Sequence, residues 1–95
     1  MAAKFVIPKS LSILGKNIPV KRGNLKDAHG QFDRTDFEIT LDTKCPAHLI
    51  EETLMHEAMH AVLWISGVSQ LLREDLEEAI CFATEGLTNS FKVRK

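Results

Sequence analysis

Residues 53–62 read Thr-Leu-Met-His-Glu-Ala-Met-His-Ala-Val and contain the pattern His-Glu-x-x-His, with His56, Glu57 and His60 at its three fixed positions. Side chains four residues apart lie on the same face of a helix, so the two imidazoles converge on one point. A zinc ion can bind two neutral ring nitrogens presented in this way by one rigid helix. Glu57 lies about a third of a turn away and can instead take a proton from a water molecule on the metal. The pattern therefore predicts a Zn²⁺ site with His56 and His60 as ligands and Glu57 as the general base.

The sequence on either side of this stretch predicts that it belongs to a helix. Pro46 can occupy the first position of a helix, where its missing N–H costs nothing, and Gly67 suits a left-handed C-terminal stop. The first helix is therefore expected over residues 47–66. A second helix is expected over residues 70–91, with an apolar face formed by Leu72, Leu76, Ala79, Ile80, Ala83 and Leu87.

A catalytic zinc site usually has three protein ligands and one open position, so a third ligand must come from another part of the chain. His29 and His48 are candidates. The second helix offers five acidic residues: Glu74, Asp75, Glu77, Glu78 and Glu85. Helical phase alone does not select one, because Glu78 and Glu85 share a face while Glu77 lies closer to the apolar side. The structural alternative is that the histidines are partly buried packing residues and the carboxylates are solvated.

Before residue 43 the chain consists of short segments with β character, punctuated by glycine and asparagine. Four segments are candidate strands, at residues 10–14, 18–22, 29–32 and 37–41. In the last of them Phe37, Ile39 and Leu41 alternate with polar residues, which indicates a half-buried strand. We therefore expect an α+β fold, with a small antiparallel sheet of about three strands followed by two helices. A chain of 95 residues has room for one such domain, over residues 1–95.

Composition argues against several classes of partner. A formal net charge of −1 gives no long-range attraction to nucleic acid or to an anionic membrane, so neither is an expected partner. No apolar run approaches the ~18 residues needed to cross a bilayer, and the patch at residues 5–7 is too short for a signal peptide. Cys45 and Cys81 form no metal-binding pair in the sequence and are interpreted as structural thiols in a reducing cytoplasm.

Two stretches resemble a known group of enzymes. Residues 53–62 resemble the active-site helix of zincin metallopeptidases, and residues 77–87 are similar to the glutamate helix of the gluzincin branch. Together they resemble small phage and prophage metallopeptidase-like proteins and the related ImmA/IrrE family. The resemblance implies a minimal zincin-like domain in the cytoplasm of a host cell. It also implies that the third zinc ligand is Glu78, with the adjacent Glu77 as the main competitor.

The resemblance further implies a function. A gluzincin hydrolyses a peptide bond, and ImmA-like relatives act on regulatory proteins, so a narrow set of protein targets is expected. The alternative is a binding module with a zincin fold and a structural zinc. A nucleic-acid-binding regulator is a third hypothesis, which neither the charge nor any motif supports.

The chain departs from the larger peptidases in three ways. It contains no tyrosine to stabilise an oxyanion, and no motif selects a substitute among His29, Arg34 and His48. Phe82 stands where thermolysin-like enzymes have an aspartate that orients a zinc-binding histidine. The glutamate helix is not followed by the C-terminal lobe of those enzymes.

Overall fold

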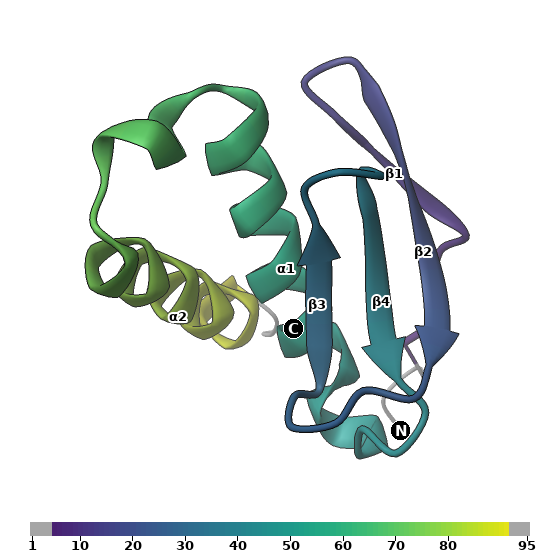
Figure 1. The fold of residues 1–95 in the computed structure, drawn as a ribbon. Coiled ribbons are helices and arrows are strands. Elements are labelled where there is room, and N and C mark those ends of the chain that lie inside the picture. Colours follow the sequence, from purple (N-terminus) through teal and green to yellow (C-terminus); the bar gives the residue numbers. More distant parts are fainter. Residues whose placement is uncertain (1–4, 92–95) are drawn as a thin grey trace.

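The computed structural model describes residues 5–91 and shows an α+β fold with a four-stranded mixed sheet and two α-helices (Figure 1). Two short 3-10 turns precede the helices. In chain order the elements are β1 (Ser10–Ile13), β2 (Lys16–Gly23), β3 (Gly30–Asp33), β4 (Glu38–Asp42), η1 (Ala47–Leu49), α1 (Ile50–Ile65), η2 (Val68–Leu71) and α2 (Glu74–Phe91). Among the residues described, none of the helices combines the length and the apolar character needed to cross a membrane.

The sheet differs from the expected one in the number and direction of its strands. It has four strands in the order β1-β2-β4-β3, and β2 runs parallel to β4, whereas about three antiparallel strands were predicted. The pairs β1–β2 and β3–β4 are antiparallel as expected. β4 lies between β2 and β3 in the sheet, so β2 has β4 as its neighbour in place of β3, and these two strands run in the same direction. Ile39 and Leu41 of β4 are fully buried, and a central position covers such a strand from both sides.

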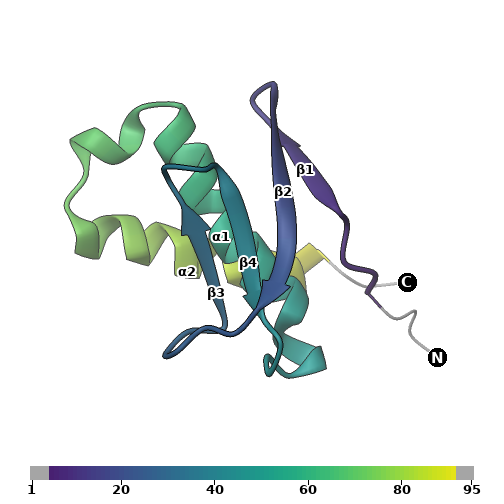
Figure 2. The same ribbon diagram turned by 45° about the vertical axis from the view of Figure 1, so that its right-hand side comes forward.

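The hydrophobic core lies between the sheet and α1. Its buried members are Ile13, Ile18, Ile39, Leu41, Leu54 and Ala61, which come from β1, β2, β4 and α1. Figure 2 shows α1 lying against the sheet and α2 packing on α1 beyond it. The helix that carries the His-Glu-x-x-His pattern is therefore fixed on one side by the sheet and contacts α2 on the other.

The predicted end of the first helix is confirmed, whereas both helices begin a few residues later than predicted. Gly67 ends the first helix in a left-handed conformation with φ of 85°, as predicted. The predicted start at residue 47 is instead a 3-10 turn, and α1 begins at Ile50. The predicted start of the second helix at residue 70 falls in η2, and α2 begins at Glu74.

The predicted apolar face of the second helix is wrong at Leu76, Ala79 and Ala83, although Leu72 and Ile80 are partly buried. Leu76 is 47% exposed, whereas Glu77 is only 6% exposed and Cys81 is fully buried. Ala79 and Ala83 are also exposed, and the side chain of Leu87 lies outside the described part of the chain. The face that α2 turns towards α1 is the polar one, because it contacts the two histidines.

Candidate metal centre

The His-Glu-x-x-His residues lie in a cleft between α1, α2 and the edge strand β3. His56 and Glu57 are each 8% exposed, and His60 is partly buried. A cavity of about 460 Å³ opens beside them. Its lining residues include His56, Glu57, Glu78, Phe82 and Glu85 together with Asp27–Gly30 of the β2–β3 connection. A second cavity of about 270 Å³ lies on the other side of Glu78 and contains His60.

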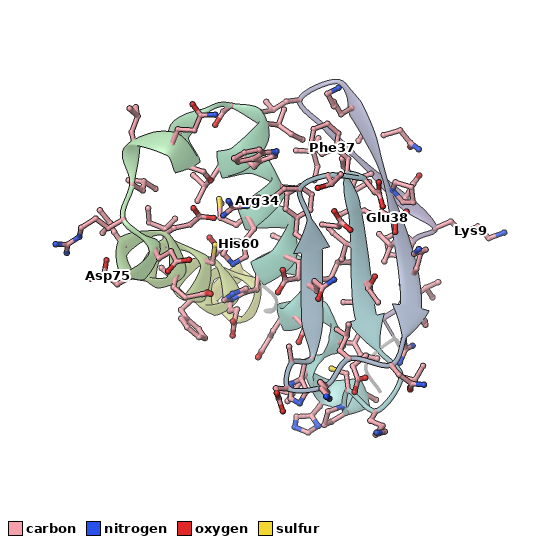
Figure 3. All side chains as sticks on the ribbon, viewed as in Figure 1. Lys9, Arg34, Phe37, Glu38, His60 and Asp75 are labelled. Atoms are coloured by element: carbon pink, nitrogen blue, oxygen red, sulfur yellow. The ribbon has the colours of Figure 1, made fainter. Side chains whose placement is uncertain are left out.

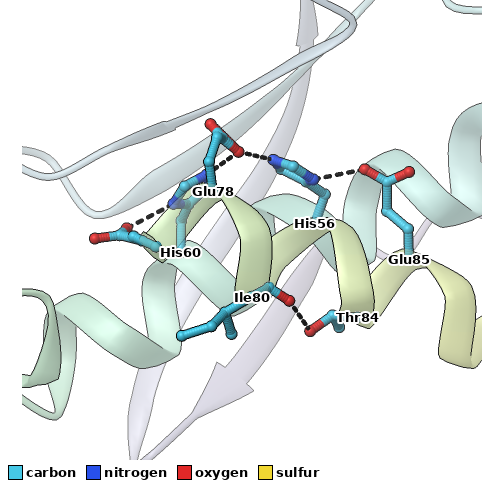
Figure 4. Close-up of polar contacts among 7 residues, drawn as sticks. His56, His60, Glu78, Ile80, Thr84 and Glu85 are labelled. Atoms are coloured by element: carbon cyan, nitrogen blue, oxygen red, sulfur yellow. Dashed lines mark hydrogen bonds and ion pairs between the residues drawn. The ribbon is translucent and has the colours of Figure 1, made fainter. Parts of the chain in front are cut away.

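Each histidine is held through its Nδ1 atom by a carboxylate of α2 (Figure 4). The Nδ1 atom of His56 lies 2.6 Å from Oε2 of Glu85, and that of His60 lies 2.7 Å from Oε2 of Glu77. Burial raises the pKa of Glu77, but the hydrogen bond with His60 together with smaller contributions, including the charges of His60 and Arg34, outweighs it, and the net pKa is lowered. An ionised carboxylate only accepts hydrogen bonds, so these contacts suit the tautomer with the proton on Nδ1, which is the one that can bind a metal through Nε2. The Nε2 atoms then carry the lone pairs.

Both Nε2 atoms face a single oxygen of Glu78. Oε1 of this residue lies 2.7 Å from Nε2 of His56 and 3.4 Å from Nε2 of His60. Two nitrogen lone pairs and a carboxylate oxygen repel one another unless a cation lies among them, either a proton or a metal ion. The two histidines are surrounded by four carboxylates, those of Glu57, Glu77, Glu78 and Glu85. The negative charges of these groups further favour the binding of a cation. The donor set therefore fits a divalent metal ion.

Cys81 offers a second possible third ligand. A nitrogen of His56, a nitrogen of His60 and Sγ of Cys81 all lie within 4.8 Å of one another, so this group could hold a metal ion. Burial, together with the neighbouring carboxylates, raises the pKa of this thiol to about 12. A thiol binds a metal as the thiolate, and a bound metal ion itself favours the loss of the thiol proton, so both Cys81 and Glu78 are candidate third ligands.

Glu57 is positioned by the edge strand. The backbone N–H of Phe32 donates a hydrogen bond to its carboxylate. Burial raises the pKa of Glu57 above the usual carboxyl range, and the two histidines counteract this only in part. A buried glutamate with a raised pKa, next to two histidines that could hold a metal ion, is a suitable general base.

Gly30 allows β3 to approach α1 closely at this point. A Cβ atom at Gly30 would lie 2.7 Å from Cγ2 of Thr53 and 3.0 Å from Cγ of Glu57. Thr53 lies one turn before Glu57 on α1, so both contacts lie on the same helix face. The absence of a side chain at Gly30 therefore allows the short distance between β3 and the side chain of Glu57.

We expect Gly30→Ala to destabilise the protein by about 1–3 kcal/mol, because the methyl group must displace Thr53 or Glu57. Gly86→Ala is the matched control, since a Cβ at that position in α2 would meet nothing within 4 Å. The control should leave stability unchanged or raise it by about 0.5–1 kcal/mol through helix propensity. Urea unfolding of both variants makes the comparison. Equal stability of Gly30→Ala and wild type would show that β3 does not approach α1 as closely as described.

The free edge of β3 borders the same cleft. The carbonyl of His29 accepts a hydrogen bond from the N–H of Asp42 at 2.7 Å. The alternation of an antiparallel pair then directs the backbone N–H and C=O groups of Gly30 and Phe32 away from β4. The carboxylate of Asp42 accepts hydrogen bonds from the N–H groups of Leu25 and Lys44, which ties the β2–β3 connection to the end of β4.

The other residues named from the sequence have different positions. His29 is exposed and lines the cavity of about 460 Å³, while His48 is exposed and lines none of the cavities around the histidines. Arg34 lines the cavity that contains His60. Glu74 and Asp75 lie further out, at a third cavity.

Sequence reasoning missed the contacts of Glu85 and Cys81 with this site. Cys81 lies three residues after Glu78 and Glu85 lies seven after it, so all three share one helix face. That spacing could have identified them once Glu78 was placed. Glu77 immediately precedes Glu78 on α2 and contacts Nδ1 of His60. No comparable sequence signal predicts this contact.

Comparisons with protein-family models, with curated proteins and with solved structures found no match for this chain.

Proposed function

We propose that the protein is a zinc-dependent peptide-bond hydrolase with a minimal zincin-like fold of the gluzincin type. The observation that carries this proposal is the convergence of both Nε2 atoms on Oε1 of Glu78, with Glu57 lining the same cleft. The resemblance of residues 53–62 and 77–87 to the zincin helices supports the same assignment.

His56, His60 and Glu78 would hold the ion. Two imidazole nitrogens and a carboxylate oxygen form a donor set that zinc commonly binds in catalytic sites. When bound, zinc supplies a Lewis acid that polarises a carbonyl group and makes water acidic enough to act as a nucleophile near neutral pH. Glu85 and Glu77 would keep the two rings oriented through their Nδ1–H groups.

Glu57 performs the proton transfers in this proposal. Its carboxylate removes a proton from the attacking water, and the resulting carboxylic acid then donates that proton to the leaving amine. Burial favours this exchange, because it raises the pKa of the carboxyl group and makes the carboxylate a stronger base. The Phe32 N–H holds the same carboxylate in place during both transfers.

An extended peptide is the substrate that this cleft accommodates. The outward-directed N–H and C=O groups of Gly30 and the C=O group of Phe32 can pair with a peptide strand at the free edge of β3, while the N–H of Phe32 stays with Glu57. Backbone pairing selects for an extended chain rather than for a particular sequence. Protein targets are therefore the proposed substrates, and the resemblance to the ImmA/IrrE family suggests regulatory proteins of a phage or its host among them.

A binding module with structural zinc is the second candidate, favoured by the position of Cys81. His56, His60 and Cys81 bring two nitrogens and a sulfur together, and structural zinc sites commonly use cysteine and histidine. In that case Glu57 would have no chemical role.

The proposal is tested with untagged protein, a metal assay and a peptide library. About one zinc per chain is expected, with cleavage of a limited set of peptides detected by mass spectrometry. Cleavage should stop after chelation and return when zinc is added back. Stoichiometric zinc without any cleavage would favour the binding module. Protein that neither retains nor takes up zinc would contradict both candidates.

A further inference from the structure

Arg34 lies directly after β3, at the end of the cleft where His60 is found. The carboxylate of Asp33 accepts hydrogen bonds from the N–H groups of Thr35 and Asp36, at 2.8 and 3.0 Å, and so fixes the turn that carries Arg34. Figure 3 shows Arg34 and His60 between α1, α2 and the sheet. The two residues also line the same cavity together with Glu57 and Glu78.

The guanidinium of Arg34 is held by an aromatic ring and not by a carboxylate. Its Cζ atom lies 4.8 Å from the centre of the Trp64 ring, within cation–π range. Trp64 is one turn after His60 on α1, so the helix that carries the histidine also carries the ring beneath the arginine. Among the side chains that the structure describes, Arg34 makes no ion pair within 4.0 Å.

The cavities around Arg34 are acidic, yet among the described side chains no carboxylate lies within 4.0 Å of its guanidinium, and its charge acts on Glu77 only from a longer distance, where it helps to lower the pKa of that carboxyl. The cavity of about 510 Å³ beyond His60 is lined by Arg34 together with Glu74, Asp75, Glu77 and Glu78. Stacking on Trp64 leaves the N–H groups in the plane of the guanidinium available for a ligand. The acidic surroundings repel an anionic ligand while no cation is bound, whereas a divalent metal ion held by His56, His60 and Glu78 would offset their charge and allow a negative oxygen to lie against Arg34.

We propose that Arg34 is a catalytic residue that donates hydrogen bonds to the carbonyl oxygen of the peptide bond being hydrolysed. This role rests on the proposed hydrolase function. The water oxygen bonds to the carbonyl carbon, its proton passes to Glu57, and the carbonyl π electrons move onto the oxygen that faces Arg34. When the C=O bond reforms, the C–N bond breaks and Glu57 returns the proton to the amine. Arg34 stabilises the negative oxygen and transfers no proton.

The other residues that could replace the missing tyrosine are placed less favourably. His48 lines none of the cavities around the histidines. His29 lines the cavity on the opposite side of Glu78 from Arg34. A guanidinium is also a cation throughout the physiological pH range, whereas a histidine is not.

N-phosphoryl-alaninamide tests this role through binding, because its tetrahedral phosphoryl group resembles the proposed oxyanion. Zinc-loaded wild type is expected to bind it, with a change in the fluorescence of Trp64, the only tryptophan in the chain. Arg34→Gln should weaken binding by about 10- to 100-fold without loss of zinc, and Arg34→Lys should restore part of it. Lys16→Gln is the matched control, since it removes a cation lying 5.0 Å from the Phe37 ring and neither residue lines a cavity of this site.

For any peptide that wild type cleaves, Arg34→Gln should reduce kcat by about 10²- to 10³-fold with little change in KM. Circular dichroism and zinc content should match wild type. Probe affinity and kcat of Arg34→Gln equal to those of wild type would overturn the role of Arg34 and leave the hydrolase function intact. Wild-type protein that holds zinc but does not bind the probe would overturn it as well. Arginine-dependent probe binding without cleavage of any peptide would make Arg34 an anion-binding residue only, and would overturn its catalytic role together with the proposed hydrolysis.

Discussion

Replacement of Glu57 by glutamine is expected to lower peptide hydrolysis by about 10²- to 10⁴-fold while the protein keeps its zinc. Glutamine has nearly the same shape and can still meet the N–H of Phe32 through its amide oxygen. It cannot take a proton from water. Because Glu57 is not among the atoms that converge on Oε1 of Glu78, the metal site should be unaffected.

The comparison requires initial rates and zinc content for wild type and Glu57→Gln under the same conditions. Glu38→Gln is a suitable control, since this glutamate pairs with Lys21 at 2.6 Å on the sheet, outside the cleft. Undiminished cleavage by Glu57→Gln would show that the general base is another residue. Equal binding of a protein partner by both forms, without any cleavage, would support the binding module instead.

Replacement of Glu78 by glutamine should weaken zinc binding more than any other single change on α2. Among the described residues of α2, Glu78 places a carboxylate oxygen against the Nε2 atoms of both histidines. Glu77→Gln and Glu85→Gln remove partners of the Nδ1 atoms and should each weaken zinc binding by about 10- to 100-fold. For Glu78→Gln we expect a loss larger than ~100-fold, since a ligand itself is removed.

Competition with a chromophoric chelator measures these affinities on one scale. Glu74→Gln is the matched control, because it makes the same change of charge one turn before Glu78 on the same helix. Its zinc affinity should stay within about twofold of wild type, as expected for a distant solvated charge. Cys81→Ala separates the two possible ligand sets. Loss of zinc in Cys81→Ala but not in Glu78→Gln would make Cys81 the third ligand and would favour the structural zinc site.

The sequence predicted the helix that carries the candidate site because its signals are local. The spacing of His56 and His60 places both rings on one face of any helix, and Gly67 ends that helix whatever packs against it. The alternation around Ile39 and Leu41 likewise predicted a half-buried strand before the sheet was known. These features depend on residues a few positions apart.

The order of the strands could not be predicted in the same way. A small antiparallel sheet satisfies the alternation patterns as well as the observed order β1-β2-β4-β3 does. The strand order depends on which strand has a neighbour along both of its edges. β4 takes this central place, and its inward-facing residues are fully buried. The edge position of β3, which borders the cleft, is a consequence of that order.

The inward face of α2 was also decided by tertiary structure. Hydrophobicity predicted that Leu76, Ala79 and Ala83 would face inwards, yet these residues are exposed and Glu77 is buried. The buried histidines of α1 need hydrogen-bond partners, and the carboxylates of α2 provide them.

The sequence by itself therefore determined which helix presents His56, Glu57 and His60, since that depends only on helical spacing. Tertiary structure alone decided that Glu78 faces both Nε2 atoms and that Glu77 and Glu85 hold the Nδ1 atoms. Tertiary structure also brought Arg34 over Trp64 beside the same cleft. The physical reason is that these contacts join residues 17 to 30 positions apart, whose distances are fixed by the packing of α2 and β3 on α1 and not by any local spacing.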